Sequence, residues 1–344
     1  MKAVVLHAPH HLVIEDRPIP MPGEGDVLVR IHRGGICGSD MHYYHHGGFG
    51  TVRIKSPMVP GHELSGIVER LGAGVSSIAV GTAVAVNPSL ACGTCSFCVK
   101  GMSRHCSDMR FMGSAMRTPH IDGGFREYVV VRATQAVPVG EMAGLEEAAC
   151  AEPLAVCLHA VSQAPDLRGK RVLVTGFGPI GALTFLAARH AGADAISATD
   201  IADMPLELAK KLGAEAVWNV SAADVMEEEF RDRGEFDVVF ECSGSPAAMR
   251  LAIGVTKPSG TIVQVGLLPD EIKAAFNPMI TKEITFRGTF RFDSEFDLAV
   301  QLISDRTIDV RPIISRTFPF ERADDAFAFA RHRQQAIKVM LEFA

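Results

Sequence analysis

The chain has 344 residues, of which 47% are hydrophobic and 22% are charged, a composition typical of a globular protein with room for two domains. Its formal net charge is −6 and it has no basic block, which disfavours a nucleic-acid partner. No apolar run reaches the roughly 20 residues that span a bilayer, and His7 and Pro9 interrupt the N-terminus before a signal-peptide core could form. We therefore expect a cytoplasmic protein without a membrane partner.

Short β-rich segments dominate the first 140 residues. They are separated by Gly, Pro, Asn and Asp, and few regular helices are expected between them. The segments are 27–32, 63–72, 82–88 and 126–139. This pattern predicts a β-barrel-like domain that carries loops.

Strands and helices alternate after Pro153. The predicted strands cover 170–176, 195–200, 236–242, 261–266 and 284–290, and the predicted helices cover 179–192, 205–213 and 246–255. Alternation at this spacing indicates a doubly wound parallel sheet, so the fold class is α/β. After residue 293, two helix-like stretches and a strand at 337–343 are too short to fold alone. We expect domains at 1–153 and 154–292, with 293–344 returning to complete the first.

Four cysteines form the most specific motif of the chain, within a lobe at about residues 90–108. Their spacing, C-x2-C-x2-C-x7-C, is short enough to close a tetrahedral cage around one Zn²⁺, and four thiolates leave no position open for chemistry. The ligands are Cys92, Cys95, Cys98 and Cys106. An iron–sulfur cluster is the alternative, whereas disulfides do not suit a reducing compartment. The motif predicts structural zinc.

A glycine-rich motif, G-x-G-x-x-G, lies between a predicted strand and a predicted helix. Its glycines allow a pyrophosphate to approach the backbone, and the helix N-terminus offers free N–H groups to the phosphates. The residues are Gly176, Gly178, Pro179, Ile180 and Gly181. Asp200 ends the next strand, where a carboxylate can bind the adenosine ribose and repel a 2′-phosphate. The motif therefore predicts a nicotinamide dinucleotide, with NAD favoured over NADP.

A second metal site is indicated by Cys37 and His62 in the β-rich half. A catalytic zinc takes three protein ligands and keeps one position open, and a carboxylate could supply the third. Bound zinc acts as a Lewis acid that lowers the pKa of an alcohol. Ser39 and His42 could relay the released proton to solvent, and Asp40 could orient His62.

The motifs CGSDMH, GHELSGIVERLGAGV, GFGPIG and the four-cysteine lobe resemble the zinc-dependent medium-chain dehydrogenase/reductase family over nearly the whole chain. Within it, RGGICGSDMHYY, AEPLAV and RGTFRF resemble the polyol and sugar-acid branch. The resemblance implies a GroES-like catalytic domain and a Rossmann domain. It also implies a catalytic zinc on Cys37, His62 and Glu152, with Glu63 near enough to exchange as a ligand.

The same resemblance implies a substrate pocket lined by Tyr43, Phe111 and Arg291, with the guanidinium of Arg291 binding a sugar-acid carboxylate. The expected reaction is reversible oxidation of L-idonate at C5 to 5-keto-D-gluconate with NAD. Many NAD-using relatives carry Arg five residues after the strand-end acid, where this chain has Pro205, so NADP stays an alternative.

Two alternatives stay open at this stage. A sorbitol- or xylitol-type polyol dehydrogenase would share every catalytic residue and need no cation for a carboxylate. A non-catalytic nucleotide-binding protein would keep the fold and lose the chemistry. Relatives are dimers or tetramers, so we expect a homo-oligomer, although the sequence does not give its size.

Overall fold

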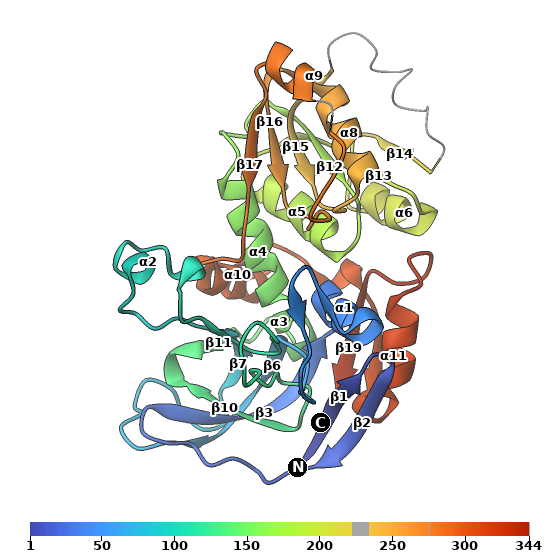
Figure 1. The fold of residues 1–344 in the computed structure, drawn as a ribbon. Coiled ribbons are helices and arrows are strands. Elements are labelled where there is room, and N and C mark those ends of the chain that lie inside the picture. The colour runs from blue at the N-terminus through green and yellow to red at the C-terminus, as the bar shows by residue number, and fades with distance from the viewer. Residues whose placement is uncertain (222–233, 275, 344) are drawn as a thin grey trace. The chain divides into compact units, whose positions relative to one another are not determined.

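The computed structural model describes residues 1–221, 234–274 and 276–343. These residues form two compact units (Figure 1). The first unit holds Met1–Glu152, Asp293–His332 and the residues from Lys338 onward, and the second holds Pro153–Phe292 and Arg333–Ile337. The segment after residue 293 thus belongs mainly to the first unit, with 333–337 grouped with the second.

The first unit is built on a seven-stranded sheet of order β11-β7-β6-β3-β19-β18, with β10 also pairing with β3. The strands are β3 (Asp26–Gly35), β6 (Glu63–Leu71), β7 (Ala83–Val86), β10 (Tyr128–Arg132), β11 (Ala136–Pro138), β18 (Ile314–Pro319) and β19 (Lys338–Glu342). Strand β19 pairs antiparallel with β3, so a strand near the C-terminus joins the sheet of the first unit. Strand β18 is a strand that the sequence pattern did not predict.

Smaller elements surround this sheet. Strands β1 (Lys2–Ala8) and β2 (His11–Asp16) form a hairpin, and short pairs join β4 (Gly48–Phe49) to β5 (Val52–Arg53) and β8 (Ser89–Leu90) to β9 (Arg110–Phe111). The helices include α1 (Gly38–His46), α2 (Ser96–Val99), α3 (Leu145–Ala148), α10 (Glu295–Ser304) and α11 (Ala323–Ala330). Helix α4 (Ala151–Ser162) begins in the first unit and continues into the second.

The second unit holds, among its described residues, a parallel sheet of order β14-β13-β12-β15-β16-β17. The strands are β12 (Arg171–Thr175), β13 (Ala195–Asp200), β14 (Val217–Asn219), β15 (Phe236–Glu241), β16 (Thr256–Gln264) and β17 (Thr285–Gly288). Helices α5 (Pro179–His190), α6 (Asp203–Lys211), α8 (Pro246–Val255) and α9 (Phe276–Thr281) connect them. In chain order the strands run 3-2-1-4-5-6, the doubly wound Rossmann arrangement. The predicted fold class is confirmed.

The core of the second unit lies between this sheet and its helices. Leu173, Val239 and Ile262 occupy neighbouring positions in β12, β15 and β16, and all are buried with Ala252 and Ile253 of α8. Strands covered on both faces need apolar side chains on both faces, which explains the continuous apolar runs in the sequence. The buried sheet leaves its strand ends free to hold polar groups.

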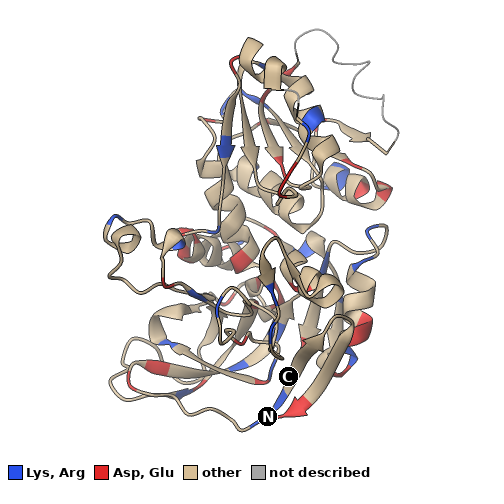
Figure 2. Ribbon diagram, viewed as in Figure 1, with Lys and Arg blue, Asp and Glu red and all other residues tan. Residues whose placement is uncertain are grey.

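Acidic and basic residues are interspersed along the elements of both units (Figure 2). Several form ion pairs within one unit, including Arg17 with Glu15, Arg171 with Glu235 and Arg306 with Glu147. Over the described ranges, no helix combines the length and the apolar character needed to cross a membrane.

Candidate functional site

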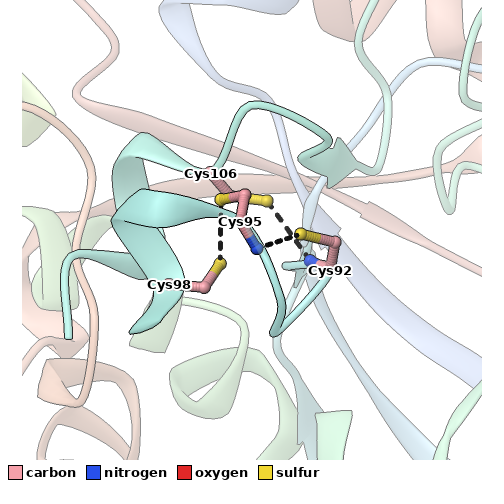
Figure 3. Close-up of side chains that lie close together, drawn as sticks. All are labelled: Cys92, Cys95, Cys98 and Cys106. Atoms are coloured by element: carbon pink, nitrogen blue, oxygen red, sulfur yellow. Dashed lines mark hydrogen bonds between the residues drawn. The ribbon is translucent and has the colours of Figure 1, made fainter. Parts of the chain in front are cut away.

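Four cysteine side chains converge in the lobe around α2 (Figure 3). One sulfur from each of Cys92, Cys95, Cys98 and Cys106 lies within 4.8 Å of the others. None of these thiols is in a disulfide. We call this group the thiol cluster.

Backbone N–H groups point at the sulfurs of the thiol cluster. The N–H of Cys92 donates to Cys106 Sγ at 3.2 Å, and the N–H of Cys95 donates to Cys92 Sγ at 3.4 Å. The pKa of the Cys95 thiol is lowered to about 5, chiefly by a hydrogen bond from the backbone of Cys98. Donors placed around sulfur stabilise thiolate, the form that binds metal, so this donor set fits one tetrahedral Zn²⁺ with no open position.

The thiol cluster is tied to the segment that follows the second unit. Arg104 of the short helix η1 (Ser103–His105) donates its backbone N–H to Asp293 Oδ1 at 2.6 Å, and its guanidinium pairs with Asp293 Oδ2. Asp293 precedes α10, so the lobe and α10 are joined by a charged contact within the first unit.

A second group of candidate ligands lies in the first unit, with two of its three members buried. One ligand atom from each of Cys37, His62 and Glu63 lies within 4.8 Å of the others, and we call these three residues the mixed cluster. Burial, followed by the negative charge of Glu63, raises the pKa of the Cys37 thiol to about 12. A bound cation would reverse that balance, because metal binding stabilises the thiolate.

Local structure sets the geometry of the mixed cluster. Cys37 is the N-cap of α1, and Asp40 in the first turn accepts the Cys37 N–H at 3.0 Å and the Gly61 N–H at 3.1 Å. Asp40 therefore fixes the two loops that carry Cys37 and His62. His62 Nδ1 is 3.9 Å from Asp40 Oδ1, which is an electrostatic contact rather than a hydrogen bond. This buried Nδ1 has no hydrogen-bond partner among the described residues.

Strands β3 and β6 bring Glu63 into the mixed cluster. Gly35, at the end of β3, is the register partner of Glu63 at the start of β6. A Cβ at position 35 would lie 2.0 Å from Glu63 Oε2, so the carboxylate occupies space that only a glycine leaves open. The pairing of β3 with β6 thus directs a carboxylate inward at this point.

Lys338 is the cation of this buried region. Its Nζ lies 2.7 and 2.6 Å from the two oxygens of Glu63 and donates to the carbonyl of Ile36 at 3.2 Å. Only 1% of the lysine is exposed. Burial opposes its charge, but Glu63 outweighs burial and the pKa of Lys338 is raised. The pair places the lysine ammonium against the Glu63 carboxylate, beside Cys37 and His62.

Glu152, in the first turn of α4, is buried and lies outside the group of three. Its carboxylate makes no hydrogen bond or ion pair with the described residues. Burial raises the pKa of Glu152 to about 8, while His62 acts in the opposite direction. Glu152 is therefore a buried carboxylate close enough to His62 and Cys37 to sense their charges.

Three of the other predicted residues of the first unit lie on α1 and one lies on β9. Ser39 is half-buried and His42 is exposed. Tyr43 is buried, and its hydroxyl accepts the Ala115 N–H at 3.0 Å. The Phe111 ring lies 5.4 Å from the His62 ring. Arg291 belongs to the second unit, where its guanidinium lies 4.9 Å from the Phe290 ring centroid.

The glycine-rich motif follows β12 and opens α5. Gly178 is the N-cap and Pro179 the first residue of that helix. A Cβ on Gly181 would lie 2.0 Å from the carbonyl oxygen of Gly176, whereas a Cβ on Gly178 would meet nothing within 4 Å. The turn is tight on its inner side and open beside Gly178, the geometry that a pyrophosphate at a helix N-terminus requires.

Asp200 ends β13 and is buried. Its Oδ2 accepts the Phe177 N–H at 2.7 Å, and its Oδ1 accepts the Ala202 N–H at 3.0 Å. The carboxylate thus holds the glycine turn in place. Each carboxylate oxygen has a further lone pair that a ribose hydroxyl could use.

Two buried charged residues were not predicted from the sequence: Lys338, beside Glu63, and Glu241, at the end of β15. Lys338 stands in the apolar run IKVMLEF, and Glu241 ends the apolar strand FDVVFE. A charged residue inside or at the end of a buried strand is rare unless it is paired, and this rarity was the available signal. Their partners lie far away in sequence, so the pattern could not identify them.

Comparisons with known proteins identify the family of this chain. The family model described as "Alcohol dehydrogenase GroES-like domain" matches residues 23–141, and the model described as "Zinc-binding dehydrogenase" matches residues 179–305. The chain is 43% identical to the L-idonate 5-dehydrogenase (NAD(P)(+)) of Escherichia coli (strain K12), over 92% of this chain and 91% of that protein. It is 35% identical to the sorbitol dehydrogenase of Gallus gallus, over 99% and 96% of the two chains.

The fold agrees as well. The crystal structure of the L-idonate 5-dehydrogenase from Escherichia coli superimposes with a TM-score of 0.94 at 41% identity, covering 99% of this chain and 98% of that one. The family expected from the motifs is confirmed, and so are the expected zinc and nicotinamide dinucleotide. The chain belongs to the zinc-dependent medium-chain dehydrogenases, enzymes that act on alcohols and polyols.

Proposed function

We propose that this enzyme oxidises L-idonate at C5 to 5-keto-D-gluconate, reversibly, with NAD as the acceptor. The observation that carries the chemistry is the convergence of the half-buried Cys37 thiol with the buried His62 imidazole and Glu63 carboxylate. The substrate is inferred from the 43% identity to an L-idonate 5-dehydrogenase.

In this proposal Cys37, His62 and Glu152 hold the catalytic zinc, and the thiol cluster holds the structural zinc. Zinc at the mixed cluster would supply Lewis-acid polarisation of the substrate hydroxyl. Both oxygens of Glu63 are engaged by Lys338, which leaves the unpartnered carboxylate of Glu152 as the third ligand. Glu63 would exchange as a ligand only when it leaves that ion pair.

Ser39 and His42 provide the route for the proton. Ser39 is two residues from Cys37 and half-buried, and His42 is exposed at the next turn of α1. Burial of part of the ring, with the nearby His46, lowers the pKa of His42. A neutral imidazole at the surface can accept a proton from the serine hydroxyl and release it to solvent.

The glycine turn and Asp200 would hold the dinucleotide, which accepts the hydride. We propose contacts from the backbone of Gly176, Gly178, Pro179, Ile180 and Gly181 to the pyrophosphate, and from Asp200 to the adenosine ribose. A buried carboxylate at that point disfavours a 2′-phosphate, which supports NAD. The L-idonate 5-dehydrogenase of Escherichia coli is named for both NAD and NADP, so NADP stays the alternative.

Tyr43, Phe111 and Arg291 are the proposed substrate contacts. The Phe111 ring next to His62 supports a position at the pocket wall, and Tyr43 would contribute its ring because its hydroxyl already accepts a backbone N–H. Arg291 would bind the sugar-acid carboxylate, since its planar guanidinium forms two parallel hydrogen bonds.

The direct test is nicotinamide absorbance with zinc-replete protein. We expect rapid NADH oxidation with 5-keto-D-gluconate and slower NADPH oxidation. Activity only with sorbitol and NAD would move the enzyme to the polyol branch, for which the 35% identity to a sorbitol dehydrogenase is the supporting observation. No activity with any of these would favour the non-catalytic alternative.

The substitution Arg291→Ala separates the two substrate classes. Loss of a charged, two-point contact is expected to raise KM for the keto acid by roughly tenfold or more, while KM for sorbitol stays unchanged. An equal rise in KM for the keto acid and for sorbitol would show that Arg291 does not recognise the carboxylate. The assignment of the metal ligands would stay unchanged.

The proposal includes a cytoplasmic homo-oligomer. All eight cysteines are free thiols, which suits a reducing compartment. Among the described residues β17 is an edge of its sheet, its four residues are exposed, and Phe286 lies on it. An exposed strand edge that carries an apolar side chain invites pairing with an identical strand across a two-fold axis. Light scattering should report a dimer or tetramer, and Phe286→Lys should lower its mass.

A further inference from the structure

The carboxyl ends of β12, β15 and β16 meet at a buried carboxylate that the reaction chemistry does not use. Thr175, Glu241 and Gln264 occupy adjacent register positions on these three strands. Glu241 is 0% exposed. Ligands of doubly wound sheets bind where the strand order reverses, which here is between β12 and β15. Glu241 therefore ends a strand at the expected dinucleotide crevice.

Five neutral donors surround the Glu241 carboxylate. Oε1 accepts the N–H of Ser243 at 2.8 Å, the hydroxyl of Ser243, and the hydroxyl of Thr175 at 3.3 Å. Oε2 accepts the N–H of Gly244 at 3.0 Å and the amide Nε2 of Gln264. An ionised carboxylate is acceptor-only and can satisfy all of these donors at once, so the network is complete only with Glu at this position.

The network holds the loop at 242–244 in contact with the glycine turn. Gly176 has a φ of 79°, and a Cβ there would lie 2.5 Å from the Cβ of Ser243. The Cys242 N–H also donates to the Thr175 carbonyl at 2.9 Å. Glu241 thus accepts hydrogen bonds from Thr175, which precedes the glycine turn, and from Ser243, which packs against Gly176. Movement of either contact would move Gly176.

We propose that Glu241 is a positioning residue for the dinucleotide. It holds the loop at 242–244 and the glycine turn in their binding geometry before the cofactor arrives. This inference rests on the proposed binding of the dinucleotide at the glycine turn. It predicts that the charge of Glu241 matters for cofactor affinity. A glutamine keeps one oxygen acceptor but would aim its NH2 group at the backbone N–H of either Ser243 or Gly244.

The test is a fluorescence titration of NADH into zinc-replete Glu241→Gln, wild type and a matched control. Glu235→Gln is the control, because Glu235 stands beside the opposite end of β15 in a half-exposed pair with Arg171. We expect Kd for NADH to rise about tenfold or more in Glu241→Gln, as expected from losing charged hydrogen bonds, and to stay unchanged in Glu235→Gln. KM for NADH should rise with Kd, while KM for the keto acid stays constant.

A purely structural role would give a different pattern. A Glu241→Gln variant with a lower Tm and wild-type affinity for NADH would overturn the inference. If that variant does not fold, Ser243→Ala removes one donor and keeps the carboxylate, and an unchanged Kd in that variant would also overturn it. Wild-type protein that binds neither NADH nor NADPH would instead overturn the proposed function.

Discussion

The thiol cluster and the mixed cluster both lie in the first unit, but they combine different ligands in different surroundings. Four thiols from one short stretch of chain form the first, and three of them are half-exposed. The second combines the thiol of Cys37 at the start of α1 with His62 and Glu63 at the start of β6, and the proposed third ligand, Glu152, comes from α4; His62, Glu63 and Glu152 are buried. Four thiolates complete a tetrahedron, whereas three mixed ligands leave a position for substrate.

The surroundings explain why the two sites are not interchangeable. Backbone N–H groups point at the Cys106 and Cys92 sulfurs, and backbone hydrogen bonds from Cys98 and Ser107 lower the pKa of Cys95 to about 5. Burial raises the pKa of Cys98 to about 12, so a bound cation is needed for all four to be thiolates. Burial raises the pKa of Cys37 to about 12, so its thiolate depends on a bound cation. A structural metal can be bound entirely by ligands from one short segment. A catalytic metal needs a buried site whose ligands come from distant parts of the chain.

The largest expected effect separates the two clusters by activity. Cys37→Ala should lower kcat/KM by about a thousandfold or more, because Lewis-acid stabilisation is worth several kcal/mol and each ~1.4 kcal/mol is a factor of ten. Steady-state kinetics and metal analysis should show an inactive, folded protein that keeps one zinc. Substantial remaining activity would contradict the catalytic role of the mixed cluster.

The converse substitution affects stability first. Cys106→Ala removes a buried ligand of the thiol cluster, and loss of a structural metal costs more than about 4 kcal/mol in many proteins. Thermal unfolding should start at a clearly lower temperature, with kcat nearly unchanged below that temperature. A loss of kcat without a fall in Tm would reverse the assignment of the two sites.

Lys338→Met tests the pair that supports the mixed cluster. Removing one partner of a buried ion pair leaves Glu63 unpaired, at a cost of about 3–5 kcal/mol. Chemical denaturation should show this loss. Lys2→Met is the control, since its pair with Asp16 is solvent-exposed and should leave stability unchanged. Equal results for the two variants would mean that burial of the Glu63–Lys338 pair is unimportant.

The smallest effect is expected at the anchor of the thiol cluster. Arg104→Ala removes the guanidinium contact to Asp293 and should cost about 1.5–3 kcal/mol, the range for hydrogen bonds to charged groups. Arg117→Ala, in the more exposed pair with Asp108, serves as the control. Differential scanning calorimetry should rank Arg104→Ala below Arg117→Ala in Tm, and the opposite ranking would contradict the anchoring role.

The features that sequence predicted best are local ones. The cysteine spacing and the glycine turn lie within 15 and 6 residues of chain, respectively, and a short segment fixes such geometry wherever it lies in the fold. The parallel sheet was predictable because each buried strand is a continuous apolar run. Helix α6 begins at Asp203, two residues before the predicted start, since end positions depend on local capping.

The features that sequence missed depend on distant pairing. Lys338 reaches Glu63 across 275 positions of the chain, through the pairing of β19 and β6 with opposite sides of β3. Asp40 lies 3.9 Å from His62 Nδ1, as its expected role beside His62 requires, but its contacts to the N–H groups of Cys37 and Gly61 were not predicted. Side-chain partners of this kind follow from strand register and loop geometry, which a periodicity in the sequence does not encode.

The most direct test of the two-site account is a chelator titration of the wild-type enzyme that follows zinc content, kcat and Tm in the same samples. We expect two zincs per chain. In whichever order they leave, kcat should fall in proportion to the loss of one zinc, and Tm should fall in proportion to the loss of the other. A single zinc whose removal abolishes activity and lowers Tm together, or full activity after both are gone, would contradict it.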